Sequence, residues 1–391
     1  MAKIDDSVKK KVPELRFKGF TDDWEERKLI EVADYRNGKA HEKYISEAGD
    51  YIVVNSKFVS TNGLVKKYSD EMIAPLSKNE IAFVLSDVPN GRAIARTFLI
   101  SEENKYSLNQ RIAGITPHAD TNSYFLHSLM NRNHYFLRFD DGVSQTNLSK
   151  KEVEKWVELY PSYGEQQRIG SFFKQLDDTI ALHQRKLDLL KEQKKGFLQK
   201  MFPKNGEKVP ELRFAGFADD WEERKLNEVA IFYNGQRIPI DSSLRKQGEY
   251  PYYGATGIID YVEDYIFDGE FVLLAEDGAN ITMRNSPIAY LTQGKFWLNN
   301  HAHIMAMKDG SNNFLVQLLE KQNYEKYNSG TAQPKLNSQV VKSLNFLFPT
   351  KEEQKKIGSF FKQLDNTIAL YQRKLDLLKE QKKGFLQKMF V

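Results

Sequence analysis

Two stretches of this chain, residues 165–202 and 353–390, are near copies of each other. They differ at four of 38 positions, which pair Gln167 with Lys355, Arg168 with Lys356, Asp178 with Asn366, and His183 with Tyr371. Apolar residues in both recur at alternating spacings of four and three, which is the pattern of a helix that packs on another helix. Each would span about 55 Å as a helix, and so long an apolar seam is seldom left in water. Each copy is therefore predicted to be a long helix that pairs with the other copy as a coiled coil.

The predicted seam of the first copy has two sets of positions. Its a positions are Phe173, Ile180, Leu187, Lys194 and Met201, and its d positions are Ile169, Leu176, His183, Leu190 and Phe197. The polar members, His183/Tyr371 and Lys194/Lys382, are of the kind that sets the register of a coiled coil.

Further apolar residues lie outside this seam and recur in both copies. They are Phe172, Leu182, Leu189 and Leu198, repeated as Phe360, Leu370, Leu377 and Leu386. One antiparallel partner would not bury them fully, and wider apolar faces suit bundles of more than two helices. We predict that helices of partner proteins complete such a bundle. The alternative is that these eight residues pack against the chain's own domains.

A second repeat precedes each variable segment. The sequence VPELRFKGFTDDWEERKL at residues 12–29 recurs at 209–226 with only Lys18/Ala215 and Thr21/Ala218 changed. We refer to both copies as the VPELRF motifs. The chain is thus a tandem duplication, which predicts a pseudo-twofold molecule, and Pro203 ends the first long helix. The expected divisions are residues 1–162 and 203–350 for two domains, with residues 163–202 and 351–391 for the long helices.

The variable segments, 30–160 and 227–348, are largely dissimilar but share landmarks. Gly142–Leu148 aligns without a gap on Gly330–Leu336, and Pro161 falls on Pro349. Short apolar runs between turn residues predict strands. These strands are residues 51–54, 80–85 and 111–116 in the first segment, and 270–274, 288–291 and 302–307 in the second. Residues 123–136 and 313–327 have helical spacing. The fold class is therefore α+β, with two domains of one mixed fold and different surfaces.

Charge is distributed unevenly. The chain has a formal charge of +4. The first long helix has 8 basic and 5 acidic residues and the second 9 and 4, so together they carry +8 and the remainder carries −4. Any nucleic-acid surface outside the helices must therefore be a local patch. The absence of cysteine, of a secretory signal and of an apolar run of about 18 residues predicts a cytoplasmic protein.

Motifs of self-contained enzymes are missing. There is no GxxxxGK phosphate loop, no GxSxG elbow, no dinucleotide fingerprint and no signature of amino-group methyltransferases. His301 and His303 would share one face of a strand, but no third metal ligand is apparent, which favours a structural role. Glu192–Lys194 and its copy Glu380–Lys382 resemble the end of a nuclease motif but are predicted to lie on a solvated helix face. We therefore expect a non-catalytic chain without a metal site.

Polar turns form the remaining candidate site. The turn from Asp87 to Arg92 is predicted to hold out an arginine, and residues 276–284 lie at a comparable place in the second half. Arginine reads guanine and asparagine or glutamine reads adenine, while polar loops hold phosphates. The predicted DNA-binding residues are Asn55, Lys57, Asn90, Arg92, Gln110, Arg111, Gln145, Thr146, Asn147, Arg237, Asn280, Thr282, Arg284, Asn300, Gln333, Lys335 and Asn337.

The chain closely resembles the specificity subunit of type I restriction-modification systems. The resemblance rests on VPELRF-x-GF followed by Trp24 or Trp221, on the segments that begin at Glu165 and Glu353, and on LLKEQKKGFLQKMF at the end of each long helix. It covers the whole chain. It implies two target recognition domains, each binding one half of a split, asymmetric DNA sequence, joined by two antiparallel helices that act as a spacer.

The resemblance also implies that catalysis takes place in partner subunits. Two modification subunits would methylate adenine with S-adenosylmethionine, and two restriction subunits would use ATP and Mg for translocation and cleavage, with no cofactor bound by this chain. Two alternatives remain. A stand-alone bipartite DNA-binding regulator is disfavoured by the extra apolar stripe, and a self-contained methyltransferase or nuclease is disfavoured by the missing motifs.

Overall fold

The computed structural model describes residues 12–89, 91–204, 206–330 and 333–390, and it divides into two compact units. The first unit comprises residues up to His183 together with those from Lys374 onward, and the second comprises Gln184–Arg373. Each unit therefore contains one variable segment and parts of both long helices. In the described part of the chain, none of the helices combines the length and apolarity needed to span a membrane.

A four-stranded antiparallel sheet, in the order β2-β9-β5-β7, is central to the first unit. This sheet lies in the core because its strands are apolar, and all four residues of β5 are buried. A second, three-stranded sheet has the order β4-β3-β8, and two short ladders pair β1 with β11 and β6 with β10. The strands are β1 (Glu25–Lys28), β2 (Ala33–Asn37), β3 (Tyr51–Val54), β4 (Tyr68–Ser69), β5 (Ile81–Val84), β6 (Ser86–Asp87), β7 (Thr97–Leu99), β8 (Tyr106–Leu108), β9 (Ile112–Pro117), β10 (Thr146–Asn147) and β11 (Val157–Tyr160). The short helices are α1 (Leu29–Val32), α2 (Ser56–Ser60), α3 (Ser123–Met130), α4 (His134–Leu137) and α5 (Lys150–Glu154).

The second unit repeats this arrangement. Its antiparallel sheet has the order β13-β20-β17-β18, a second sheet has the order β15-β14-β19-β16, and β12 pairs with β21. The strands are β12 (Glu222–Lys225), β13 (Ala230–Phe232), β14 (Gln247–Gly254), β15 (Gly257–Val262), β16 (Phe267–Asp268), β17 (Phe271–Ala275), β18 (Ala289–Thr292), β19 (Lys295–Leu298), β20 (Ala302–Met307) and β21 (Asn345–Phe348). The helices are α7 (Leu226–Val229), η1 (Asn234–Gln236), η2 (Ser242–Leu244), α8 (Asn280–Met283), α9 (Asn312–Lys321), η3 (Glu325–Tyr327) and α10 (Ser338–Ser343).

The six predicted strands are confirmed within one or two residues, as β3, β5, β9, β17, β18 and β20. The two predicted helical stretches are each divided. Residues 123–136 form α3 and then α4, because Arg132 has a left-handed φ of 58° and Asn133 caps the next helix through Tyr135 N. Residues 313–327 form α9 and η3. The α+β class is confirmed.

The two long helices, α6 (Tyr163–Lys200) and α11 (Lys351–Met389), run antiparallel in each unit. In the first unit Phe172 lies against Phe385 with ring centroids 5.0 Å apart, and Asp177 forms an ion pair with Lys382 at 2.5 Å. Residue numbers thus rise along α6 while they fall along α11.

The second unit shows the same pairing. Phe197 lies 5.0 Å from Phe360, and Lys194 forms an ion pair with Asp365 at 2.6 Å. The predicted seam is confirmed, since its residues Phe173, Leu187 and Leu190 are buried.

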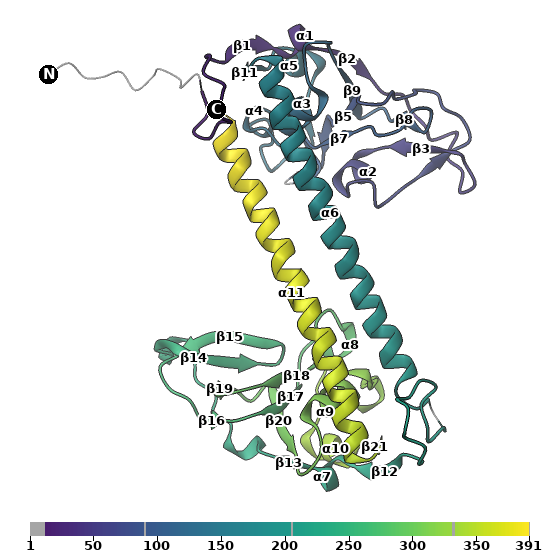
Figure 1. The fold of residues 1–391 in the computed structure, drawn as a ribbon, viewed down its shortest axis with the longest axis vertical. Coiled ribbons are helices and arrows are strands. Elements are labelled where there is room, and N and C mark those ends of the chain that lie inside the picture. The colour runs from purple at the N-terminus through teal and green to yellow at the C-terminus, as the bar shows by residue number, and fades with distance from the viewer. Residues whose placement is uncertain (1–11, 90, 205, 331–332, 391) are drawn as a thin grey trace, which may run out of the picture. The chain divides into compact units, whose positions relative to one another are not determined.

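Each long helix is attached to its domain through a VPELRF motif. Arg16 donates two hydrogen bonds of 2.7 Å to Glu165, and Arg213 does the same to Glu353. A helix glycine also permits close contact in each unit. A Cβ on Gly170 would lie 2.3 Å from Asn122 Oδ1 at the start of α3 (Figure 1), so the helix can approach only with glycine there.

Candidate nucleic-acid interface

Three loops meet at one edge of the first unit. Strand β6 pairs with β10, so that Asp87 faces Thr146, and Leu148 N donates to Leu85 O at 2.8 Å. Leu85 N in turn donates to Arg111 O at 3.1 Å, which brings the turn before β9 to the same edge. We call this set the first loop cluster. Its residues are Ser86, Asp87, Gln110, Arg111, Gln145, Thr146 and Asn147.

The second unit has a matching edge. A β-bridge joins Asp277 to Lys335, Leu336 N donates to Glu276 O at 2.7 Å, and Glu276 N donates to His301 O at 2.9 Å. These hydrogen bonds correspond one for one to those of the first unit. We call this set the second loop cluster, and its residues are Asp277, Asn300, His301, Gln333 and Lys335.

Five of the residues predicted in the first half come together in the first loop cluster. Gln110, Arg111 and Asn147 are exposed, and Gln145 donates through Nε2 to Ser86 Oγ at 2.7 Å. Thr146, by contrast, is only 4% exposed, and its hydroxyl donates to Asp140 Oδ1. Its position gives it a supporting contact inside the cluster.

The predicted arginine turn is present in the first unit. The carboxylate of Asp87 accepts hydrogen bonds from Ala93 N at 2.6 Å and Ile94 N at 3.1 Å, which closes the turn. Arg92 is exposed at its end. Asn90 lies outside the described residues.

Asn55 and Lys57 lie beside this edge on α2. Asn55 caps the helix by accepting a bond of 2.9 Å from Phe58 N, and Lys57 is exposed. The preceding carbonyl, of Val54, accepts from Asn109 N at 3.1 Å. Both residues are therefore neighbours of the first loop cluster along adjacent strands.

In the second half, Asn300, Gln333 and Lys335 are exposed members of the second loop cluster, and exposed Asn337 caps α10 through Gln339 N. The turn that follows β17 uses its polar residues internally. Asn280 exchanges hydrogen bonds with the Ser286 backbone, at 2.9 and 3.0 Å.

The remaining predicted residues of this turn are exposed. Thr282 Oγ1 donates to Ala279 O at 3.1 Å. Arg284 ends α8 in a left-handed conformation, with its guanidinium against the carbonyl of Glu320.

Arg237 is enclosed, with a side chain only 12% exposed. Its Nη1 donates to Glu276 Oε2 at 2.6 Å and to Ala302 O at 2.7 Å, and its Nε donates to Asn234 O at 2.9 Å. These bonds occupy the guanidinium within the protein.

Two residues beside Arg237 were missed by the prediction of the site. Glu276 is largely buried, and His303 is fully buried with Nδ1 3.3 Å from Glu276 Oε2. Burial lowers the pKa of His303, although the Glu276 carboxylate opposes this shift. The neutral ring donates from Nε2 to Leu336 O at 2.9 Å, while Nδ1 accepts from Asn234 Nδ2 at 3.0 Å. The sequence placed Glu276 in a candidate turn and His303 two residues after His301, but neither pattern predicted their contact.

Large apolar side chains are exposed beside both loop clusters. Val88 and Val143, at 64% and 84% exposure, adjoin β6 and β10, and Met283, at 65%, ends α8. Apolar side chains at a DNA surface contact thymine methyl groups. Polar residue types alone did not predict these positions.

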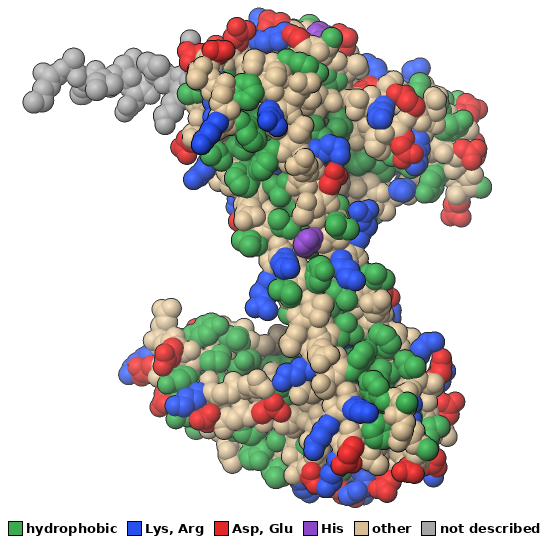
Figure 2. Space-filling model, in the orientation of Figure 1, with side chains coloured by type: hydrophobic (Ala, Val, Ile, Leu, Met, Phe, Trp, Pro, Cys, Tyr) green, Lys and Arg blue, Asp and Glu red, His purple; other side chains and the backbone are tan. Residues whose placement is uncertain are grey.

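The eight apolar residues of the predicted helix stripe divide into two groups. Phe172 and Leu386 pack against the core of the first unit, and Leu198 and Phe360 pack against that of the second. The other four are exposed by 45–59%: Leu182, Leu189, Leu370 and Leu377. Hydrophobic and basic side chains lie together on the visible face of the helices (Figure 2).

The exposed leucines lie in pairs. Five residues beyond the Asp177–Lys382 ion pair, toward the middle of each helix, come Leu182 and Leu377. Five residues from the Lys194–Asp365 pair, again toward the middle, come Leu189 and Leu370. Each unit thus exposes two leucines at one level of its helix pair.

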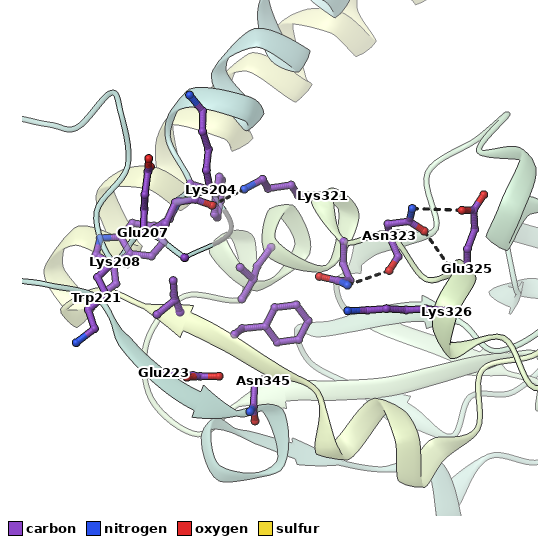
Figure 3. A pocket seen from close by; sticks show the side chains of 17 residues that line it. Lys204, Glu207, Lys208, Trp221, Glu223, Lys321, Asn323, Glu325, Lys326 and Asn345 are labelled. Atoms are coloured by element: carbon purple, nitrogen blue, oxygen red, sulfur yellow. Dashed lines mark hydrogen bonds between the residues drawn. The ribbon is translucent and has the colours of Figure 1, made fainter.

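A cavity of about 860 Å³ lies elsewhere in the second unit (Figure 3). Residues of the segment after α6, the end of α9 and strand β21 line it, and Lys321 Nζ donates to Pro203 O there at 2.9 Å. None of the predicted DNA-binding residues lines this cavity. Within the described ranges, no group of three or more metal-ligating side chains is assembled, and His301 instead faces the Asp277 carboxylate at 2.8 Å.

Comparison with known proteins shows that both halves of the chain match the same family model. A family model described as type I restriction modification DNA specificity domain matches residues 21–192 and again residues 218–380. A putative type I restriction enzyme specificity subunit of Haemophilus influenzae is 39% identical over 168 residues, which are 43% of this chain and 42% of that protein. The alignment thus spans less than half of that relative.

Two further proteins are similar over nearly the whole length. The type I restriction enzyme MjaVIII specificity subunit of Methanocaldococcus jannaschii is 21% identical over 417 residues, 93% of this chain and 91% of that protein. The crystal structure of a type I restriction-modification S subunit from M. genitalium has a TM-score of 0.73 at 14% identity, covering 97% of this chain and 99% of that one. This likeness shows a common fold.

Proposed function

Because the chain belongs to the family of type I restriction-modification DNA specificity subunits, which recognise DNA without catalysing its modification, we propose that it reads an asymmetric target in two halves. The variable domain of each unit would bind one half-site. One observation supports this most directly: two units whose central sheets have the same strand order present different side chains at the same loop edge. Two different half-sites follow from two different edges.

The first loop cluster has the chemistry of a base reader. Arg111 and, on the neighbouring turn, Arg92 can donate two hydrogen bonds to guanine, while Gln145 and Asn147 can pair with adenine. Lys57 and the backbone amides of the turns suit phosphate contacts. Val88 and Val143 add apolar surface for thymine methyl groups.

The second loop cluster would read its half-site with other groups. Asp277 can accept a hydrogen bond from cytosine N4, and Gln333 and Asn300 can pair with adenine. Lys335 of this cluster, with Arg284 and Asn337 on the neighbouring loops, would provide donors to phosphates. His301, which is exposed, and Asp277, whose side chain is 21% exposed, occupy the places of Arg111 and Ser86 in the first unit.

The exposed leucine pairs are the proposed docking surface for modification subunits. An exposed leucine on a paired helix adds apolar surface that a third and fourth helix can cover. Because the pairs occur once per unit, two modification subunits would bind. Two restriction subunits would complete the complex, and S-adenosylmethionine, ATP and Mg would bind those partners.

The recognition function is tested by co-expressing this chain with the modification subunits of its source and mapping N6-methyladenine at single-molecule resolution. A single bipartite motif with two unlike halves is expected. Exchanging residues 30–160 for the segment of a relative should change one half only. Methylation by the purified chain alone, or a change in both halves, would contradict the proposal, and binding without any partner would favour the stand-alone regulator.

The docking surface is tested separately. Leu182→Asp with Leu377→Asp should abolish co-purification of a modification subunit through the first unit, and Leu189→Asp with Leu370→Asp should do so through the second. Ala181→Asp with Ala369→Asp is the matched control, since both alanines are exposed and occupy equivalent places beside the leucines. Unchanged co-purification of the leucine variants would refute this surface.

A further inference from the structure

The second unit buries charged groups where the first unit is apolar. The matched hydrogen bonds place Glu276 at the position of Leu85, since each accepts from the following loop through its carbonyl. The sheet register likewise places His303 at the position of Ala113, because Leu274 and Phe83 pair with them. We call Arg237, Glu276, His303 and Asn234 the buried network.

The buried network holds the loop that carries Gln333 and Lys335. His303 Nε2 donates to Leu336 O at 2.9 Å, and Leu336 N donates to Glu276 O at 2.7 Å. The first of these hydrogen bonds comes from a network side chain, whereas the second joins backbone groups and has a counterpart in the first unit, from Leu148 N to Leu85 O. Asn234 extends the contact by donating to Ser338 Oγ at 3.0 Å, just beyond the loop.

The network also includes a carboxylate that faces the ammonium group of Lys335. The Nζ atom lies 3.9 Å from Glu276 Oε1, and the side chain is 54% exposed. The carboxylate thus holds the ammonium group at the protein edge. With the carboxylate present, the ammonium group can contact a phosphate from a limited range of positions. Without it, the ammonium group could contact phosphates from many positions, and such contacts carry no sequence information.

Stability alone does not explain why this network is present. Buried ion pairs often contribute no more to stability than well-packed apolar residues of similar volume. The first unit forms the same strand pairing with Leu85 and Ala113 at two of these positions. The polar residues are therefore dispensable for the strand arrangement, and their bonds converge on one loop.

We propose that Glu276, supported by Arg237 and His303, is a positioning residue that determines the base specificity of the second half-site. Its carboxylate contacts Arg237 and the ring of His303, whose Nε2 binds Leu336 O, and it restrains Lys335. The inference rests on the proposed DNA-reading function. It assigns to Arg237 an indirect role, through Glu276, in place of a direct contact with DNA.

The test replaces the network by apolar residues in one variant, Arg237→Met with Glu276→Leu and His303→Ala, within the full complex. Its thermal unfolding should match that of the original protein. Methylation maps should show an unchanged first half-site and a degenerate second one, with discrimination there reduced about tenfold or more. Binding to unrelated duplex DNA should be retained, because Lys335 can still contact phosphates when Glu276 no longer restrains it.

A control removes a carboxylate and an arginine elsewhere in the same unit. Arg224→Met with Glu228→Leu deletes an exposed pair at 3.4 Å that lies on β12 and α7, outside residues 333–337, so both half-sites should be unchanged. A stable network variant with an unaltered second half-site would overturn the inference. So would equal degradation of both half-sites.

A conservative variant decides the matter if the triple variant does not fold. Glu276→Gln keeps the side-chain shape and removes the charge that restrains Lys335. It should broaden the second half-site while leaving the first intact, and an unaltered second half-site would overturn the inference. If the original complex itself produced no bipartite methylation, the proposed function would fail instead, so the two failures are distinguishable.

Discussion

The two variable domains use one strand arrangement over different interiors. In the first, Leu85 and Ala113 continue the apolar core to the loop edge, whereas in the second Glu276 and His303 are enclosed there with Arg237. The strand pairing on both sides of this difference is the same. The pairing therefore depends on the central apolar strands, and residues near the edge can diverge in polarity without changing the fold.

The contacts between the long helices and the variable domains differ less between the two units than the domain interiors do. Asp177 pairs with Lys382 and accepts from Tyr124 Oη at 2.9 Å in the first unit. Its counterpart Asp365 pairs with Lys194 and accepts from Gln317 Nε2 at 3.1 Å. The helix ion pair is retained, and only the domain donor has moved along its helix. Contacts to the repeated helices are thus more constrained than the loop edges.

The largest effect is expected from the ion pair that both units share. Arg16→Met leaves the buried Glu165 carboxylate without its partner, and Arg213→Met does the same to Glu353. Each change should destabilise its own unit by about 3–5 kcal/mol. Urea unfolding followed by hydrogen exchange in each unit measures this. Similar losses of stability in the two units would confirm that the two ion pairs are equivalent. Clearly unequal losses would show that the two helix attachments differ.

The next effect tests the difference in the interiors. Leu85→Glu places a carboxylate in the first unit without the arginine that accompanies Glu276 in the second. It should cost roughly 2–4 kcal/mol in thermal unfolding, because an unpaired polar group is buried. Leu85→Met conserves volume and is the control, with an expected cost below about 1.5 kcal/mol. If Leu85→Glu left thermal unfolding unchanged, the interior of the first unit at this position would not exclude a carboxylate.

A smaller effect concerns pH in the first unit. The ring of His127 is partly exposed, but its Nδ1 is enclosed without a hydrogen bond, and burial lowers its pKa to about 4. An unfolded histidine titrates near 6.5, so protons bind the unfolded chain first and stability falls as the pH drops from about 6.5 to about 4. The loss is at most about 3 kcal/mol.

The matched variant is His127→Val, since Val316 occupies this place in α9 when the helix caps Asn122 and Ser311 are aligned. Its first unit should lose the pH dependence attributable to this group while remaining folded at neutral pH. Thermal unfolding at pH 5 and pH 7.5 checks this. A pH dependence unchanged by the substitution would show that other groups cause it.

The smallest effect distinguishes the loop clusters by charge. Lys335→Ala should reduce the salt dependence of DNA binding by a slope of about one, as expected for a lost phosphate contact. Asn147→Ala, at the matching place in the first unit, should leave that slope unchanged. Binding isotherms over a range of salt concentrations measure both. Equal slopes would remove the proposed difference in phosphate contact.

The regular elements were predictable because their signals are local and periodic. The seam residues Phe173 and Leu187 recur at helical spacing, and the run 81–84 is apolar throughout. What covers an apolar stripe is not a local property. Phe172 and Leu182 both lie outside the predicted seam, yet Phe172 packs on Phe385 while Leu182 is 58% exposed.

The site was predictable in part for the same reason. Gln145 and Asn147 lie in a segment with a visible counterpart, so their common loop could be recognised. The contact of Arg237 with Glu276 joins residues 39 apart, and no spacing rule links them. The residue type alone predicted that Arg237 binds DNA. Only the fold shows that its guanidinium donates its hydrogen bonds to a carboxylate and to backbone carbonyls within the protein.

The antiparallel helix pair has a consequence for synthesis on the ribosome. Met389 is buried in the core of the first unit, and Phe390 lies 5.6 Å from Phe125 and stacks on Phe173 at 5.7 Å. The nascent first domain therefore lacks part of its core until the last turn of α11 has left the ribosome. Because domains otherwise fold in order of synthesis, this domain begins first and is completed last. Part of its apolar core therefore stays uncovered during translation of the second half.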